Sequence, residues 1–372
     1  MTYRIKRIVP VICLVAALCA IALLPVSGHC ENLRFVFLAD SPVGTLPPHP
    51  APTDLINTSI LNPIISQILA LSPRPAFVVY GGDQAACGAL NGLYNFQAFK
   101  EVMAPLTSAG IKLYTALGNR ELFNPTLNPL ALGTFYLANQ QVYQRTFYEN
   151  PGNGPSGYEH LVYSFESPGG DAFFAVLDPY YLTADNPSPN LNGTFDNTQL
   201  SWLAAQVAQT KASHKFLFSH APYYYVIDPN AEGPVPPQGI SYTQLWSMLD
   251  TNRFDAAFFA HIHLFSRKAI DSSIAPNPQL TPPVQWHNNV VQVINGAAGA
   301  PIVTNPPTPP IVDPALWHIS QAANTYYFTV VDISGSRVTV TTYQGNTGAY
   351  SVLDSFTINK NAVPGTDLLL LQ

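Results

Sequence analysis

The sequence has few charged residues and no basic cluster of the kind that binds nucleic acids. Asp, Glu, Lys and Arg make up 10% of the 372 residues, and 16 basic against 22 acidic residues give a net charge of −6. The body of the chain contains no cluster of Lys and Arg. Proteins that bind nucleic acids generally carry such a basic surface, so we expect no nucleic-acid partner.

Cysteine is also scarce, and its positions limit cross-linking. Of the four cysteines, Cys13 and Cys19 lie in an apolar N-terminal run, which leaves Cys30 and Cys87 for the rest of the chain. At most one disulfide, between Cys30 and Cys87, is therefore available to the mature protein. A buried free thiol at Cys87 is the alternative. The sequence also lacks an internal repeat and a long low-complexity linker.

Hydrophobic residues, proline and glycine are abundant. A hydrophobic content of 47% over this length is ample for a large core. The 35 prolines and 23 glycines favour many strands joined by long loops over a helical protein. We expect one large domain over residues 31–360, followed by a C-terminal tail at residues 361–372.

The first thirty residues have the layout of a targeting segment. Basic residues at positions 4, 6 and 7 precede an apolar run from Ile8 to Val26 and the small pair Ser27 and Gly28. This pattern predicts a secretory signal peptide at residues 1–30, although the run is long enough to serve as an uncleaved anchor. We favour cleavage and expect a secreted or periplasmic protein. It would be attached to a membrane if the segment is not cleaved.

Apolar, β-like runs end in polar side chains at five places along the chain. The runs begin near residues 33, 76, 111, 215 and 254, and their polar ends are Asp40, Asp83, Asn119, His220 and the pair His261 and His263. In an extended segment alternate side chains share a face, so the two histidines of the last run are expected to project to the same side. Two imidazoles at the end of a buried strand suggest a metal site.

Helical patterns separate these runs. We expect helices at residues 59–71, 94–108, 196–210 and 242–250, a hairpin at 161–178, and further strands at 290–294, 326–331, 337–343 and 350–358. Strands that alternate with helices predict a layered α/β fold, and ligands in such sheets gather at the carboxyl ends of the strands. All the polar ends described above lie at that edge.

The ordered motifs resemble those of the calcineurin-like metallophosphoesterase superfamily. They are Asp40, Gly82-Asp83, Gly118-Asn-Arg-Glu121, His220 and His261-Ile-His263. The resemblance extends from about residue 33 to residue 358 and implies a four-layer α/β/β/α sandwich with a two-metal phosphoester hydrolase site. It also implies a small-molecule phosphoester as substrate and one or two divalent or trivalent metal ions, with Mn, Fe or Zn as the candidates.

The same resemblance implies how the ligands are shared. One ion would be held by Asp83, Asn119, His220 and His261, and this set is complete. The other would be held by Asp40, Asp83 and His263. Asp83 would bridge the two ions, which requires a carboxylate because it must neutralise two cations. The catalytic residues carried over are Asn119, Arg120 and His220.

Two functional positions depart from the family pattern. Pro42 stands where the family has a metal-binding histidine, and Ala86 stands where purple acid phosphatases have a substitute tyrosine. The Asp40 site would then bind its ion weakly or leave a position open for water, unless His49, otherwise a surface residue, folds back as a ligand. Arg120 replaces the histidine that protonates the leaving group. A guanidinium binds phosphate oxygens but does not donate a proton.

Two functions follow from this pattern. The first is hydrolysis of a phosphomonoester or phosphodiester by a metal-activated water. The alternative, suggested by Pro42 and Arg120, is a non-catalytic member of the family that binds a metal and an anion. We expect Glu121 to support its loop and the tyrosines at 223–225 to line a pocket or to belong to the core. The sequence predicts neither the substrate nor the oligomeric state.

Overall fold

The computed structural model describes residues 32–44, 51–127, 134–186, 193–223, 239–272, 285–302, 317–320 and 324–360. The predicted N-terminal targeting segment, the C-terminal tail, His49 and Cys30 lie outside these ranges. Among the described residues, no helix has both the length and the apolar character needed to cross a membrane.

The first sheet has six strands in the order β15-β14-β13-β1-β2-β5. They are β1 (Leu33–Leu38), β2 (Phe77–Tyr80), β5 (Lys112–Thr115), β13 (Tyr326–Ser334), β14 (Arg337–Gly345) and β15 (Tyr350–Asn359). Strands β1, β2 and β5 run parallel, so their carboxyl ends share one edge of the sheet. Strand β13 pairs antiparallel with β1 and joins the C-terminal meander to it.

The second sheet has seven strands in the order β12-β10-β11-β9-β8-β7-β6. They are β6 (Tyr163–Glu166), β7 (Ala172–Val176), β8 (His214–Phe218), β9 (Ala256–Phe259), β10 (Phe265–Ile270), β11 (Val290–Asn295) and β12 (Trp317–Ser320). Strands β7, β8, β9 and β11 are parallel. A small hairpin of β3 (Ala89–Leu90) and β4 (Leu93–Tyr94) lies apart from both sheets.

Aromatic side chains fill the space between the two sheets. Phe35 of β1 stacks on Phe77 of β2, with ring centroids 5.2 Å apart. Its ring also makes edge-to-face contacts with Phe174 of β7 and Phe216 of β8, at 5.4 and 5.3 Å. Because side chains alternate along a strand, the neighbouring positions point to the outer faces of the sheets.

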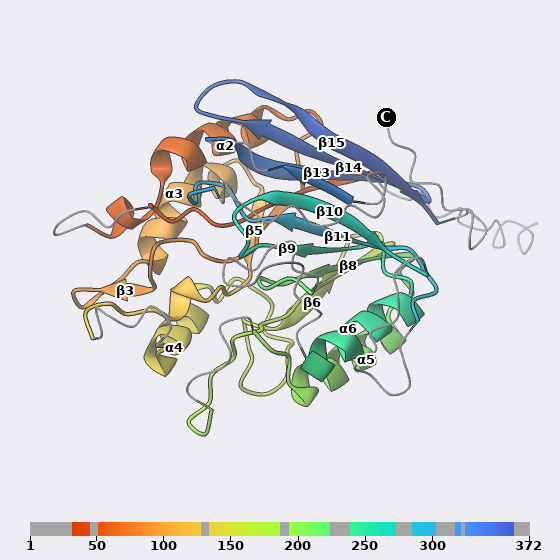
Figure 1. Cartoon of the computed structure of the whole chain (residues 1–372), viewed down its shortest axis with the longest axis horizontal. Helices are drawn as coiled ribbons and strands as arrows, with labels where there is room; N and C mark the ends of the chain where they lie inside the picture. The colour runs from red at the N-terminus through yellow and green to blue at the C-terminus, as the bar shows by residue number, and fades with distance from the viewer. Residues whose placement is uncertain are drawn as a thin grey trace, which may run out of the picture.

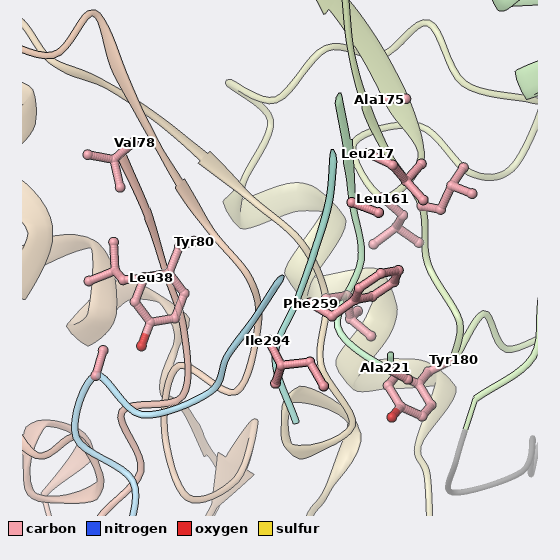
Figure 2. Packing of buried hydrophobic residues seen from close by; sticks show 14 of the residues in the cluster. Leu38, Val78, Tyr80, Leu161, Ala175, Tyr180, Leu217, Ala221, Phe259 and Ile294 are labelled. Carbon is pink, nitrogen blue, oxygen red and sulfur yellow. The ribbon is translucent and has the colours of Figure 1, made fainter. Parts of the chain in front are cut away.

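Helices lie on the outer faces of both sheets. The helices of the described residues are α2 (Thr58–Ala70), α3 (Phe96–Ser108), α4 (Leu137–Thr146), α5 (Asn197–Gln209) and α6 (Gly239–Thr251). Two short 3₁₀ turns, η1 (Pro52–Leu55) and η2 (Arg120–Leu122), lie in loops, and α4 packs against η2 and α3. Figure 1 shows α2 and α3 beside the six-stranded sheet and α5 and α6 beside the seven-stranded one. In Figure 2, buried side chains of the six-stranded sheet (Leu38, Val78 and Tyr80) lie apart from those of the seven-stranded sheet (Leu217 and Phe259).

The predicted α/β class is confirmed, as are the four predicted helices and the 161–178 hairpin, with ends that differ by a few residues. The prediction missed α4, β10, β12 and the short strands β3 and β4. Helix α4 is mostly polar and buries Asn139 and Gln140, so its apolar pattern is weak. Strand β10 contains the charged residue Arg267, whose side chain is only 1% exposed; its ion pair with Asp354 of β15, at 2.7 Å, makes this burial possible. A charged residue that is buried by a partner 87 positions away gives no apolar pattern in its own segment.

The expectation that His261 and His263 belong to an extended strand was wrong. Strand β9 ends at Phe259, and His261 has a φ of 68°, in the left-handed region. The amide of Ile262 then donates to the carbonyl of Ala260 at 2.7 Å, and Leu264 repeats this bond to Ile262. The two histidines are therefore carried by tight turns that follow the strand.

Candidate metal centre

The polar strand ends meet where the carboxyl edges of the two sheets face each other. The backbone N–H of Asp40 donates to Gly82 O at 3.1 Å, which joins the ends of β1 and β2. The N–H of His261, after β9, donates to Oδ2 of Asp40 at 3.1 Å and connects the second sheet to the first. The structure thus brings the predicted ligands together from both sheets.

Three of these residues adopt a backbone conformation that is rare outside glycine. Asp40, Asp83 and His261 have φ values of 58°, 53° and 68°. A single Asp or His in the left-handed region is tolerated, but it costs free energy and persists where the surrounding structure holds it. In each case the chain turns sharply just after its strand, and the side chain points to the centre.

Glycine allows the close approach of the loops after β2 and β5, which carry Asp83 and Asn119. A Cβ atom on Gly82, whose φ is +97°, would lie 2.7 Å from the backbone N of Gly118 and 2.7 Å from Nδ1 of His220. A Cβ on Gly118 would lie 2.4 Å from Oδ1 of Asp83. Both contacts are closer than van der Waals separation, so only glycine fits at these positions.

The tightest group of potential ligands is Asp40, Asp83 and His263. One ligand atom from each lies within 4.8 Å of the other two. The Nε2 atom of His263 is 3.6 Å from Oδ1 of Asp40, and its Nδ1 is 2.9 Å from the carbonyl of Pro301. A carbonyl only accepts, so Nδ1 carries the proton and Nε2 presents its lone pair to the centre. Oδ1 of Asp40 is buried and has no hydrogen-bond partner within the described part of the chain.

The second group surrounds Asn119 and the other two histidines. Oδ1 of Asn119 lies 3.0 Å from Nδ1 of His261. This is a hydrogen-bond distance, and the same two side chains would be available to one metal ion. His220 donates from Nδ1 to the carbonyl of Gly81 at 2.7 Å, which directs Nε2 toward Oδ1 of Asp83 at 3.4 Å. The rings of His220 and His261 are 5.2 Å apart.

The pKa values of the buried residues in the centre indicate an excess of negative charge that favours a bound cation. Burial raises the pKa of Asp40 well above its usual value. Burial would lower the pKa of His220, but the charges of Asp83 and Asp40 raise it to about 9. Burial would likewise raise the pKa of Asp83, but the charges of His220 and Arg120 bring it below its ordinary range. Buried carboxylates that retain protons or bind protonated neighbours are suited to a metal cation, and the residues present fit one.

Glu121 holds the loops that carry two of the ligands. Its buried carboxylate accepts the backbone N–H groups of Asp83, Gln84 and Gly118, at 2.8, 2.7 and 2.7 Å. Burial, followed by the charge of Asp83, raises the pKa of Glu121 to about 7. Because Glu121 contacts backbone amides, its role is to set the geometry of the loops after β2 and β5.

Arg120 contacts the aspartate at the middle of the centre. Its Nε atom lies 3.2 Å from Oδ2 of Asp83, and its backbone N–H donates to Oδ1 of the same residue at 2.9 Å.

Pro42 is buried and forms an isolated antiparallel bridge with Ile56. It offers no ligand atom from its side chain, as the sequence already required.

Several groups that surround the candidate ligands were not predicted from the sequence. The carbonyls of Gly81 and Pro301 orient two of the histidines, and a backbone group leaves no mark in the sequence. The ring of Tyr180 lies 5.9 Å from that of His220. Asp178, whose pKa burial raises to about 7, follows β7 and accepts the N–H of Tyr180 at 2.8 Å. Asp178 could have been predicted as a residue near the centre, because it follows a strand as the candidate ligands do.

Two further residues singled out from the sequence belong to the core. Tyr223 is 1% exposed and stacks on Trp246, with ring centroids 5.2 Å apart. Cys87 is a buried free thiol whose sulfur lies 3.7 Å from the amide nitrogen of Asn95. Burial raises the pKa of the Cys87 thiol to about 12, so it is unsuited to act as a thiolate ligand.

Comparison with known proteins connects this geometry to a family. The sequence profile of the calcineurin-like phosphoesterases matches residues 47–265. A search of curated protein sequences gave no match.

Solved structures have a similar fold at low sequence identity. The purple acid phosphatase PPD1 from yellow lupin (Lupinus luteus) seeds superposes with a TM-score of 0.61 at 18% identity over 90% of this chain, which spans about half (55%) of that enzyme. PhoD gives 0.55 at 11% identity, covering 88% of this chain and 70% of PhoD. GAP50, the anchor in the inner membrane complex of Plasmodium, gives 0.51 at 15% identity, covering 88% and 89%.

Proposed function

Because the chain belongs to the calcineurin-like phosphoesterase family, we propose that it is a metal-dependent hydrolase of a phosphomonoester or phosphodiester. One observation carries the proposal: ligand atoms of Asp40, Asp83 and His263 lie within 4.8 Å of one another at the carboxyl edges of both sheets. The purple acid phosphatase fold found over most of the chain is consistent with it.

Asp40, Asp83 and His263 would hold one metal ion, and Asp83, Asn119, His220 and His261 would hold another. A bound ion supplies Lewis acidity toward a phosphoryl oxygen and activates a water molecule. The candidates remain Mn, Fe and Zn.

The chain's own groups position these ligands and the substrate. The carbonyls of Gly81 and Pro301 keep the protons of His220 and His263 on Nδ1, so that Nε2 faces the centre. The side chain of Arg120 is 29% exposed and can donate to a phosphoryl oxygen at the mouth of the site. Because a guanidinium retains its proton, the leaving group must take its proton from water or from another side chain.

Hydrolysis of nitrophenyl phosphate and bis(nitrophenyl) phosphate tests this function directly. The purified protein is assayed with added Mn²⁺, Zn²⁺ or Fe, and the two substrates separate monoesterase from diesterase activity. Asp83→Asn should reduce turnover by about 10³-fold or more, since several kcal/mol of transition-state stabilisation depend on the metal centre. Asp332→Asn, which changes a carboxylate paired with Arg34, is the control. Absence of turnover with every metal and both substrates would reject the proposal.

A second function is favoured by the contact between Arg120 and Asp83. The guanidinium already neutralises a carboxylate that the hydrolase needs for metal binding. A protein that binds a metal and an anion without turnover would have this arrangement, and a structural neighbour is described as an anchor of a membrane complex. Binding of Mn²⁺ and inorganic phosphate by calorimetry, with no hydrolysis in the assay above, would favour this alternative.

We also propose that the protein acts outside the cytoplasm. The basic residues at positions 4, 6 and 7, followed by the apolar run from Ile8 to Val26, support a secretory route. N-terminal sequencing of the protein recovered from its native compartment tests this. A mature N-terminus near residue 29 indicates cleavage, an intact segment in the membrane fraction indicates an anchor, and an intact protein in the cytoplasm would contradict the proposal.

A further inference from the structure

Arg120 and Asp83 form a largely enclosed ion pair in the centre of the site. The side chain of Asp83 is 2% exposed and that of Arg120 is 29% exposed. Nε of Arg120 is 3.2 Å from Oδ2 of Asp83, and Nη1 lies 3.4 Å from the carbonyl oxygen of Ala86. The guanidinium is thus held at two points, on the side of Asp83 that faces away from His220.

Each oxygen of Asp83 has a different partner. Oδ1 accepts the backbone N–H of Arg120 and faces Nε2 of His220, whereas Oδ2 faces the guanidinium. A carboxylate that neutralised two metal ions would share its charge between them, through one oxygen or through both. The guanidinium already draws on that charge at Oδ2 of Asp83, which leaves less of it for a second cation.

Pro42 supplies no side-chain ligand to the group of Asp40, Asp83 and His263. That group would therefore depend on the charges of Asp40 and Asp83, and Asp83 is the carboxylate that Arg120 contacts. The other group has Asn119, His220 and His261 besides Asp83, so it would be less affected by the guanidinium.

We propose that Arg120 is a built-in cation that competes with a second metal ion for the negative charge of Asp83. The chain then binds one ion tightly beside Asn119, His220 and His261, and a second ion weakly beside Asp40 and His263. In the phosphoesterase, the guanidinium supplies the positive charge toward the phosphoryl group on the side of the weak site. This inference rests on the proposed function, because it concerns how the same centre is loaded.

Metal titration tests the competition without relying on turnover. The full chain is freed of metal with a chelator and titrated with Mn²⁺ in a calorimeter, and electron paramagnetic resonance detects the coupled signal of two neighbouring Mn²⁺ ions. Arg120→Met removes the charge at similar length, and Arg120→Lys keeps a charge but loses the planar two-point contact. Arg145→Met, an exposed arginine on α4, is the matched control.

The wild-type chain and Arg145→Met should bind one Mn²⁺ tightly and show no coupled signal until a large excess is added. Arg120→Met should bind the second ion at least about tenfold more tightly, equivalent to about 1.4 kcal/mol, and Arg120→Lys should stay close to wild type. Equal affinities for both ions in the wild-type chain, or a second affinity unchanged in Arg120→Met, would overturn the inference.

Two safeguards keep the result interpretable. Circular dichroism confirms that each variant is folded, and Arg120→Gln provides a second neutral variant if Arg120→Met does not fold. A wild-type chain that binds Mn²⁺ in the expected two steps but hydrolyses neither substrate would overturn the proposed function alone. An active enzyme whose second affinity does not depend on residue 120 would overturn this inference alone.

Discussion

The carboxylate of Glu121 accepts the backbone N–H of Asp83 at 2.8 Å. This bond crosses from the loop after β5 to the loop after β2, and the same carboxylate also binds the amides of Gln84 and Gly118. The position of Asp83 therefore depends on a residue that is not one of the predicted metal ligands. A buried acceptor shared by three amides stabilises a loop more than an exposed one does.

Glu121→Ala should lower the free energy of unfolding by about 3–5 kcal/mol, because three buried N–H groups lose their acceptor. Urea denaturation of the metal-free protein measures the effect. Glu101→Ala, at an exposed position of α3, should change the same quantity by less than about 0.5 kcal/mol. A loss below about 1 kcal/mol for Glu121→Ala would show that water replaces the carboxylate, contrary to this account.

Gly82→Ala should destabilise the protein and abolish tight Mn²⁺ binding, since the added Cβ would press on Gly118 and on the ring of His220. Gly92→Ala is the matched control because its φ of +78° is also left-handed but its Cβ would have no neighbour within 4 Å. The control should lose about 1 kcal/mol from backbone strain alone, and Gly82→Ala should lose several times more. Thermal unfolding and Mn²⁺ titration of both variants make the comparison, and equal losses would contradict the steric argument.

A buried histidine far from the metal centre should make stability depend on pH. Nδ1 of His214 lies 3.1 Å from Oδ1 of Asp255, and Nε2 lies 2.9 Å from the carbonyl of Gly335 in the β13–β14 turn. Burial would lower the pKa of His214, but the bond to Asp255 and its charge raise it above 6.5. Lys360, 3.2 Å from Asp255, opposes this increase.

Because the folded-state pKa of His214 is raised, its contribution to stability is complete below pH 6.5 and is lost as the pH rises through the raised value. Urea midpoints of the wild type should therefore fall over this interval more steeply than those of His214→Gln. His287→Gln, at a histidine whose side chain is 74% exposed, should follow the wild-type slope. Parallel slopes for the wild type and His214→Gln would mean that the charge of His214 does not support the fold.

Metal should stabilise the folded chain in a ligand-dependent manner. At a free Mn²⁺ concentration one hundred times the Kd, the free energy of unfolding should rise by about 2.7 kcal/mol, because the metal binds only the folded site. Addition of a chelator should reverse the rise. His261→Asn replaces a predicted ligand and should abolish most of the gain, whereas His160→Asn, outside the centre, should retain it. A gain that survives in His261→Asn would place the bound metal elsewhere.

The sequence alone determined which residues are brought to the centre. Each of these residues follows an apolar strand, and parallel strands align their carboxyl ends. They are Asp40, Asp83, Asn119, His220, His261 and His263. This pattern is local and can be recognised without coordinates, as can the α/β class. That these residues bind metal stays a prediction, which the titrations above address.

Only the tertiary structure decided how these residues are held and which of them compete. Three contacts join segments that are far apart in the chain. They are the contact of Arg120 with Asp83, the orientation of His263 by Pro301 and the burial of Arg267 against Asp354. Such contacts depend on the packing of two sheets, and no periodicity or motif records them. The candidate ligands could be predicted from the sequence because strand ends are local features. The charge balance around them arises from long-range contacts that exist only in the folded chain.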